Sequence, residues 1–445
     1  MIFKKIIILL IIFFCSVKTV SASDNKFITI VNPVRISRYT TTSSESLKSE
    51  YKAVKKYGFP ATWLLTYDAL NNKDIIDEIR KMDTNQEFGI FLEVTKTFAS
   101  ESGVGYHDSG FWHHASAVFL SGYTQEERII LIDKVFDKFK QEFGAYPKSI
   151  GSWWTDGYSL SYIKDKYGVV ANLVCSDQFS TDGYQLWGQP WQMPYYPIKS
   201  YPAVPASNLQ NKLDLVNIQW ASRDPLNGYD SSLYSTQDYL VAENNLDINY
   251  FNKLLDLYLN TNNLSQITVG LEADLDPVGY AGEFTKQIEM VKEYLNKGIN
   301  VVTMSEFYDK YKEKYPNISP STQIKSKDLL GKDVEAVWYN SPFYRLHYTK
   351  DIVNNIIQIK DIRTYGKNLI DPYFASPNYE FNLSINIPSI IDTVQNPEDV
   401  WILPKDSEII TNDNSFIIKG KNIKIPKKIK NDPLINLKIN KNEIE

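Results

Sequence analysis

Four acidic residues lie where apolar, strand-like runs of the sequence come to an end. The runs TWLLTYD, FGIFLE, SIGSWWTD and QITVGLE end at Asp68, Glu93, Asp156 and Glu272. Each run has the composition of a buried strand, and the carboxyl ends of parallel strands meet on one face of an α/β fold. We therefore expect these four carboxylates to converge on a shared site.

Two carboxylates that flank a glycosidic bond can cleave it, because one protonates the leaving oxygen while the other stays ionised. Asp156 and Glu272 are the candidate catalytic pair. In the alternative, these acids only pair with arginines or cap the helices that follow them. The candidate substrate-binding residues are Arg35, Asp68, Glu93, His113, His114, Trp153, Trp154, Trp187, Trp191, Trp220 and Asp274.

Aromatic residues favour a carbohydrate ligand, because the CH groups of a sugar ring pack on flat aromatic faces. The chain has 9 Trp and 30 Tyr, enough to line a cleft as well as fill a core. Six of the tryptophans follow predicted strands or lie in the next loops: Trp112, Trp153, Trp154, Trp187, Trp191 and Trp220. This distribution predicts an aromatic cleft, and the alternative is an ordinary aromatic core.

Three of the four histidines lie in the long loop 95–123, at His107, His113 and His114. Long loops in compact domains are often binding loops or lids. We expect these histidines to bond substrate or backbone, although three imidazoles can also form a metal site. The prediction is that the protein binds no metal and no cofactor.

Strands and helices alternate along the part of the chain that must position these residues. Strands are expected at 27–31, 61–66, 88–94, 149–154, 169–175, 213–220, 266–271 and 299–303. Helices are expected at 44–57, 74–82, 124–143, 159–167, 250–259 and 283–296, the third with a capping box of Thr124 and Glu127. The proline-rich, aromatic stretch 180–208 predicts no regular element. About seven or eight such units predict an α/β barrel over 23–314.

The composition changes after the predicted barrel. A Pro/Ser-containing linker is expected at 315–327, and short alternating runs predict a small all-β, sandwich-like domain at 328–445. Six lysines between Lys419 and Lys430 predict a basic hairpin. They indicate either a solvated sheet edge or contact with an anionic cell-wall polymer.

The N-terminus predicts export. Residues 1–22 combine Lys4 and Lys5, the apolar run Ile6–Phe14 and a small-residue cleavage site that ends at Ala22. The apolar run is too short to cross a bilayer, so we expect a secreted or cell-surface protein with no membrane span in the mature chain. Cys175 would then be the one remaining cysteine, which excludes an internal disulfide. The net charge of −5 argues against a nucleic-acid partner.

Several segments, in this order along the chain, resemble the glycoside hydrolase/deacetylase superfamily. They are FITIVNP, KYGFPATWLLTYDAL, FGIFLEVT and AYPKSIGSWWTDGYSLSYIKDKYGV, and the likeness spans about residues 26–310. It implies a distorted (β/α)7 barrel. The deacetylase branch of that superfamily has a paired Asp after the first strand and two His near the third. This chain has Val31-Asn32-Pro33 and Glu93 there instead.

The family-57-like branch resembles the acids of this chain more closely. It has a carboxylate nucleophile after the fourth strand, similar to Asp156, and a proton donor after a late strand, similar to Glu272. That resemblance implies that Asp156 is the nucleophile and Glu272 the general acid. The usual types are Glu at the first position and Asp at the second, the reverse of what this chain has.

The sequence therefore predicts an exported, metal-independent glycoside hydrolase that acts on a poly- or oligosaccharide. One alternative is a non-catalytic glycan-binding or cell-surface protein on a degenerate polysaccharide-deacetylase fold. A third is a polysaccharide deacetylase with atypical metal ligands.

Overall fold

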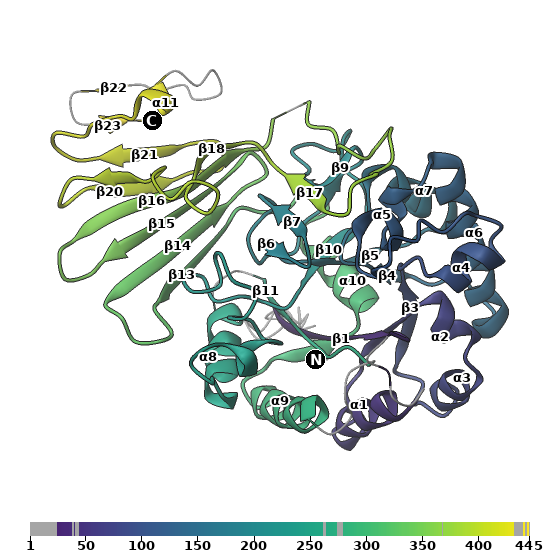
Figure 1. Cartoon of the computed structure of the whole chain (residues 1–445). Coiled ribbons are helices and arrows are strands. Elements are labelled where there is room, and N and C mark those ends of the chain that lie inside the picture. The colour runs from purple at the N-terminus through teal and green to yellow at the C-terminus, as the bar shows by residue number, and fades with distance from the viewer. Residues whose placement is uncertain are drawn as a thin grey trace, which may run out of the picture.

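A computed structural model describes residues 25–37, 40, 44–260, 264–273, 279–366, 368–430, 439–440 and 443–444 (Figure 1). The predicted signal peptide and the candidate residue Asp274 lie outside these ranges. In the described part of the chain, no helix is both long and apolar enough to cross a membrane.

Among the described residues, an eight-stranded parallel sheet curls into a nearly closed barrel, which confirms the predicted α/β fold class (Figure 1). The hydrogen-bonded path runs β10-β5-β4-β3-β2-β1-β11, and β12 pairs with the start of β1. The strands are β1 (Lys26–Val34), β2 (Thr62–Leu65), β3 (Glu87–Phe91), β4 (Ser149–Gly151), β5 (Ala171–Cys175), β10 (Val216–Trp220), β11 (Ser265–Val269) and β12 (Asn300–Val302). Strands β2, β4, β5, β10 and β11 are buried along their whole length, as expected where helices cover a parallel sheet.

Helices surround the barrel, and each of the six helices predicted from apolar periodicity is present (Figure 1). The capping box of Thr124 and Glu127 is present at the start of the long helix α6. Four short or late helices, at 67–71, 96–101, 115–118 and 304–314, were not predicted, and the second and third of them lie in the stretch 95–123 that was expected to be a loop. The helices are α1 (Glu45–Lys56), α2 (Tyr67–Asn71), α3 (Lys73–Ile79), α4 (Lys96–Glu101), α5 (Ala115–Val118), α6 (Gln125–Phe143), α7 (Gly157–Tyr167), α8 (Ile248–Tyr258), α9 (Gly279–Leu295) and α10 (Met304–Lys314).

The stretch 180–208, predicted to be irregular, contains short strands, so that prediction was wrong. The strands here are β6 (Gln178–Thr181), β7 (Tyr184–Trp187), β8 (Pro197–Ile198) and β9 (Tyr201–Pro205). Strand β7 pairs in parallel with β17 (Leu383–Asn386) from the far end of the chain. Local sequence could not reveal this partner, which lies about 200 residues away.

Antiparallel sheets follow the barrel, as predicted for the C-terminal region. The larger contains β13 (Thr322–Lys327), β14 (Val334–Asn340), β15 (Tyr344–Asp351), β16 (Ile356–Thr364), β18 (Ser389–Asp392) and β19 (Trp401–Leu403). The smaller contains β20 (Glu408–Thr411), β21 (Phe416–Lys419), β22 (Ile439–Asn440) and β23 (Glu443–Ile444). Trp338 joins the barrel core, whereas Leu346 and Ile359 form a second core with Ile418. The predicted linker was too long, because β13 occupies its second half.

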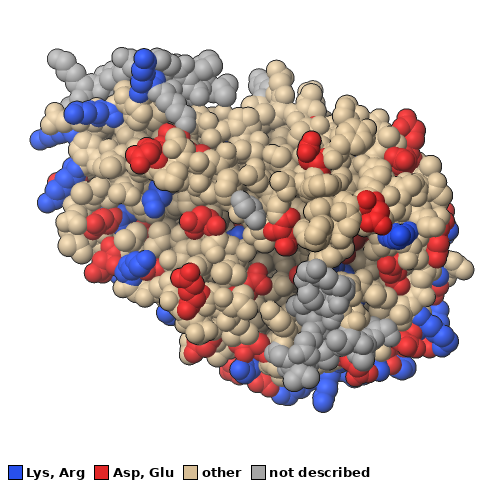
Figure 2. Space-filling view, in the orientation of Figure 1, with Lys and Arg blue, Asp and Glu red and all other residues tan. Residues whose placement is uncertain are grey.

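The lysine-rich segment does not form the predicted hairpin. Lys419 ends β21, and the chain then enters the short helix α11 (Lys427–Lys430). The side chains of Lys421, Lys424 and Lys427 are exposed. On the face drawn in Figure 2, acidic and basic side chains are interspersed.

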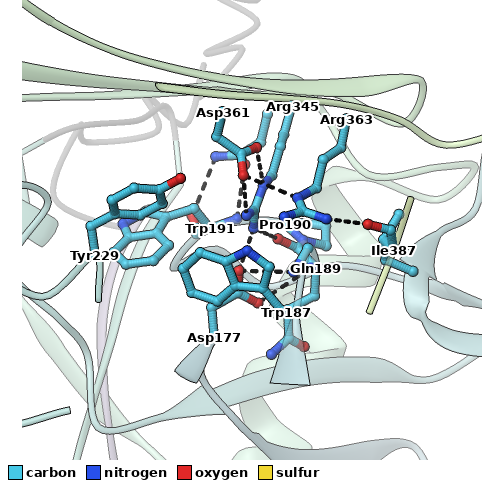
Figure 3. Close-up of polar contacts among 12 residues, drawn as sticks. Asp177, Trp187, Gln189, Pro190, Trp191, Tyr229, Arg345, Asp361, Arg363 and Ile387 are labelled. Carbon is cyan, nitrogen blue, oxygen red and sulfur yellow. Dashed lines mark hydrogen bonds and ion pairs between the residues drawn. The ribbon is translucent and has the colours of Figure 1, made fainter. Parts of the chain in front are cut away.

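Buried ion pairs join the larger C-terminal sheet to the segment after β5 (Figure 3). We call Asp177, Arg345, Asp361, Arg363 and Asp392 the seam network. Arg345 pairs with Asp177 and donates to Asp361 at 2.8 and 2.9 Å. Arg363 donates to Asp361 at 3.0 Å and pairs with Asp392. All five residues are almost fully buried, so this sheet and the barrel share one interior.

Candidate active site

Arg35 lies at the carboxyl-terminal end of the barrel strands and joins two of the predicted acids. Its Nε and Nη2 atoms donate to Glu93 at 2.9 and 2.8 Å, and its Nη1 atom donates to Glu272. The three residues follow β1, β3 and β11, so distant parts of the chain meet as expected from parallel strand ends. We call Arg35, Glu93 and Glu272 the Arg35 cluster.

Gly270 makes this meeting possible. A Cβ atom at this position would lie 1.7 Å from the backbone oxygen of Val31, so only glycine lets the chain after β11 pass so close to β1. Leu271 then donates its N–H to the buried Asn32 side chain at 3.0 Å. These contacts direct the next residue, Glu272, toward Arg35.

Aromatic rings enclose the Arg35 guanidinium. Its central carbon lies 5.4 Å from the Trp112 ring centre, 5.6 Å from Trp153 and 5.9 Å from Phe91. Trp153 in turn packs beside Trp220, with 6.0 Å between the ring centres. Cation–π contact stabilises the arginine, and the rings offer flat faces of the kind on which sugars pack.

The members of the Arg35 cluster differ in exposure. The side chains of Arg35 and Glu93 are 4% and 7% exposed, whereas that of Glu272 is 17% exposed. Glu272 also accepts a hydrogen bond from Gln237 at 3.2 Å. The neighbouring guanidinium favours the ionised carboxylate. Glu272 is therefore the member of the cluster that an incoming molecule can reach.

Asp238 is a second carboxylate in the segment that contacts Glu272, and it was not among the residues predicted from the sequence. It follows Gln237, which bonds Glu272, and it is half-buried just before the short helix η3 (Tyr239–Val241). Burial raises the pKa of Asp238 to about 6, an effect that nearby Arg223 opposes and Asp182 reinforces. A carboxyl group with such a pKa can hold a proton near neutral pH.

Asp156 has a different setting from the one predicted. Its side chain is 0% exposed, and Arg128 donates to it at 2.8 Å. The backbone and hydroxyl of Ser159 donate to it at 3.0 and 2.6 Å, so it is the N-cap of α7. A nearby buried carboxyl group, Asp371, has a raised pKa because of burial and the Asp156 charge. These are the contacts of a helix cap paired with an arginine, the structural alternative for this acid.

The other predicted polar residues lie around the site rather than in the Arg35 cluster. Asp68 is half-buried and accepts a hydrogen bond from Thr95 at 3.0 Å. His113 lies against Trp112, with 5.8 Å between ring centres. His114 stacks on Phe381 of the C-terminal region at 4.1 Å.

The predicted tryptophans separate into two groups. Trp112 and Trp153 lie against Arg35, and Trp220 packs beside Trp153 but is itself buried. Trp154 is buried beside Tyr201. Trp187 donates to Asp392 at 2.9 Å, and Trp191 stacks on Trp338 at 4.1 Å, so both are buried against the C-terminal sheet.

Among the described residues, no group of three or more His, Cys, Asp or Glu side chains is placed to hold a metal ion. Asn32 occupies the place after the first strand where the deacetylase branch has a paired Asp, and it bonds the backbone of Leu271. Glu93, in place of the histidines, bonds Arg35 through both oxygens. Both positions are thus engaged in polar contacts within the protein.

Known protein families and curated proteins show no match to this sequence. Solved structures do match. A crystal structure from Parabacteroides distasonis, of a protein assigned provisionally as a glycoside hydrolase/deacetylase, aligns with a TM-score of 0.62. The alignment covers 81% of this chain and 90% of that chain at 16% sequence identity. The chain thus shares the fold of that protein.

Weaker structural matches include two other proteins. One, from Mycobacterium smegmatis, is provisionally assigned as a polysaccharide deacetylase and has a TM-score of 0.42 and 11% identity, over 66% of this chain and 92% of that chain. The other is a family-57-type branching enzyme from Pyrococcus horikoshii, with a TM-score of 0.36 and 12% identity, over 65% of this chain and 71% of that chain.

Proposed function

We propose that this protein is a carbohydrate-active enzyme that hydrolyses glycosidic bonds without a metal ion, at the Arg35 cluster. One observation carries the proposal: Glu272 is a partly exposed carboxylate, held by Arg35 among aromatic rings at the carboxyl-terminal end of a barrel. Carbohydrate-active enzymes use this fold, and active sites of α/β barrels are built at this end. The proposed substrate is a poly- or oligosaccharide.

The two carboxylates at this rim take different roles in the proposed reaction. Asp238, with its raised pKa, donates a proton to the glycosidic oxygen as the bond to the anomeric carbon breaks. Glu272 stays ionised and stabilises the positive charge that develops on the sugar, by direct attack or by activating a water. Water finally supplies the hydroxyl group at the anomeric carbon and restores the proton of Asp238.

This assignment changes the roles expected from sequence. Arg35 favours the charged form of Glu272, which suits a nucleophile or base better than the predicted general acid. Asp156 has no exposed surface and is bound by Arg128 and Ser159, so the proposal gives it a structural role. Trp153, which is partly exposed, is the proposed stacking surface for the sugar, and the buried Trp220 packs beside it.

Glu272→Gln tests the proposal, because it keeps the shape of the side chain and removes its charge. Turnover of a responsive glycan from a broad panel should fall at least about 100-fold, with an unchanged melting temperature. Glu289→Gln, at an exposed ion pair with Lys56, is the matched control and should retain full turnover. If Glu272→Gln cleaves every glycan as fast as the native protein, the role of Glu272 is wrong.

One observation favours the second candidate, a non-catalytic glycan-binding protein. Arg35 forms ion pairs with both acids of its cluster, as in sites that are purely structural. A binding protein would retain glycan affinity with no release of reducing ends, in the native chain and in Glu272→Gln alike. Measuring both binding and reducing ends on the same panel separates the two candidates.

Export and cell-wall contact are also part of this proposal. Residues 1–22 have the pattern of a signal peptide, and exposed lysines at 421, 424 and 427 could attract an anionic polymer. Mass spectrometry of the secreted protein should find a new N-terminus just after Ala22. Binding to isolated anionic cell-wall polymer should weaken when these three lysines are replaced by glutamine.

A further inference from the structure

A series of ring contacts connects the Arg35 cluster to two exposed phenylalanines. It begins at Trp112, whose ring centre lies 5.4 Å from the central guanidinium carbon of that cluster, and continues to His113, at 5.8 Å between ring centres. His114 lies 5.1 Å from His113, and Phe381 stacks on His114 at 4.1 Å. Phe111 also contacts His114, at 5.2 Å. We call these five side chains, from Phe111 to His114 and Phe381, the aromatic platform.

The outer rings of the aromatic platform are open to solvent. Phe111 is 57% exposed and Phe381 is 55% exposed, whereas Trp112, next to the Arg35 cluster, is partly exposed. Because His114 covers one face of Phe381, so large an exposed fraction requires the rest of that ring to be open. Single exposed apolar residues are common on proteins, but two exposed phenylalanines that contact the same histidine indicate a binding surface.

Contacts between distant segments hold the aromatic platform in place. Phe381 precedes β17, whereas the other four rings lie between α4 and α5, in the segment that follows β3. The backbone N–H of Ala115 donates to the backbone oxygen of Phe381 at 2.7 Å, which joins the two segments. The Tyr184 hydroxyl donates to the backbone oxygen of His113. A surface that is already ordered loses little conformational entropy when a ligand binds.

The chemistry of the aromatic platform favours an uncharged ligand with flat apolar faces. Partial burial and the neighbouring His113 lower the pKa of His114, so this imidazole is neutral at neutral pH. Phenylalanine rings offer no charge and no hydrogen-bonding group. Flat rings of this kind suit the CH groups of a pyranose. The ring contacts also continue into the Arg35 cluster, so one extended molecule can lie on both.

We propose that the aromatic platform binds the part of a glycan that extends beyond the bond held at the Arg35 cluster, and that it makes the protein selective for long, uncharged oligosaccharides. This inference rests on the proposed function, because the same glycan must occupy both places. Phe111 and Phe381 each stack on a sugar unit. Neither was among the residues predicted from the sequence. Because Phe381 belongs to the C-terminal region, that region contributes directly to the substrate surface.

A double variant, Phe111→Leu with Phe381→Leu, tests the proposal, because it keeps apolar side chains and removes both flat rings. Cello-, malto-, xylo- and N-acetylchito-oligosaccharides, each as disaccharide and hexasaccharide, are titrated calorimetrically in the Glu272→Gln background, in which the proposed cleavage is absent. The hexasaccharide that binds should bind more tightly than its disaccharide. The double variant should lose at least about tenfold in affinity for the hexasaccharide, with unchanged disaccharide affinity and melting temperature.

Tyr146→Leu is the matched control, because it removes an exposed ring just before β4, at the opposite end of the barrel. It should bind the hexasaccharide normally. Release of reducing ends by the native chain is measured on the same panel, so that two failures can be told apart. Binding that increases with glycan length and depends on the two phenylalanines supports the aromatic platform, even if no reducing ends appear and the proposed hydrolysis is wrong.

The opposite pattern overturns the aromatic platform and leaves the proposed hydrolysis standing. In that pattern, the native chain cleaves glycans of every length equally well, and the double variant binds the hexasaccharide as tightly as its parent. The platform is also overturned if no hexasaccharide of the panel binds. A last outcome that overturns it is a native dimer that becomes a monomer in the double variant, measured by sedimentation, because a second copy of the chain would then cover these rings.

Discussion

The Arg35 cluster and the seam network are both built from arginines and carboxylates, but they differ in how far their side chains are exposed. In the seam network, Arg345 and Arg363 bond three aspartates, and none of the side chains is more than 4% exposed. In the Arg35 cluster, one arginine bonds two glutamates, and the Glu272 side chain is 17% exposed. Both clusters have aromatic neighbours, since Arg345 lies 5.2 Å from Trp338.

The difference shows how complete burial affects what an ion pair can do. Burial of Asp361 opposes its charge, but Arg345 and Arg363 together lower its pKa, so the carboxylate stays ionised and fully bonded. Such a network has no group left for a ligand, and its role is to hold the C-terminal sheet on the barrel. The Arg35 cluster leaves one carboxylate within reach of an incoming molecule, which is the minimum requirement for chemistry.

Asp238→Asn is expected to have the largest effect, because it removes the proposed proton donor beside the Arg35 cluster. Glycan turnover should fall about 10²–10⁴-fold. The native rate should be highest where Asp238 is protonated and should decline as the pH rises through about 6. Rates measured from pH 4 to 9 should show this decline in the native protein and not in the variant. Asp137→Asn, on an exposed part of α6, should keep the native profile.

Arg345→Met should have the next largest effect, this time on folding. It leaves Asp177 and Asp361 buried without this partner, which costs about 3–5 kcal/mol of the free energy of unfolding. Urea unfolding, followed by tryptophan fluorescence, measures the change. A loss below about 1 kcal/mol would mean that the seam network does not hold the two parts together.

Lys325→Met should have the smallest effect and serves as the control for the seam network. Lys325 donates to Glu335 across β13 and β14 at 3.0 Å, but its side chain is 59% exposed. Water competes for such a pair, so its loss should change the free energy of unfolding by about 0–1 kcal/mol. The same urea experiment measures it, and a cost equal to that of Arg345→Met would remove the distinction between buried and exposed pairs.

Much of the fold could be predicted because its signals are local. The helix α6 follows from its apolar periodicity and the capping box of Thr124 and Glu127, and both are present. The barrel strands were predicted within a few residues from short apolar runs. The strands β6–β9 were missed, because their pairing depends on β17 and on each other rather than on local composition.

The candidate site was only partly predictable. Arg35, Glu93 and Glu272 were selected because they follow apolar runs, and the structure brings them together. Asp156 met the same criterion, but its neighbour Arg128 comes from the start of α6, and no local signal in the sequence links the two residues. Asp238 was missed, although it lies in the long segment after β10, and loops at that end of a barrel are where site residues concentrate.

By itself, the sequence determined the order of strands and helices and the strand-end positions of Arg35, Glu93 and Glu272, since periodicity and capping act over a few residues. Only the tertiary structure decided which acids stay reachable and which tryptophans face the site. Trp187 and Trp191 were predicted for a cleft but are buried under the C-terminal sheet. Exposure depends on contacts between segments far apart in the chain, and no local pattern encodes those contacts.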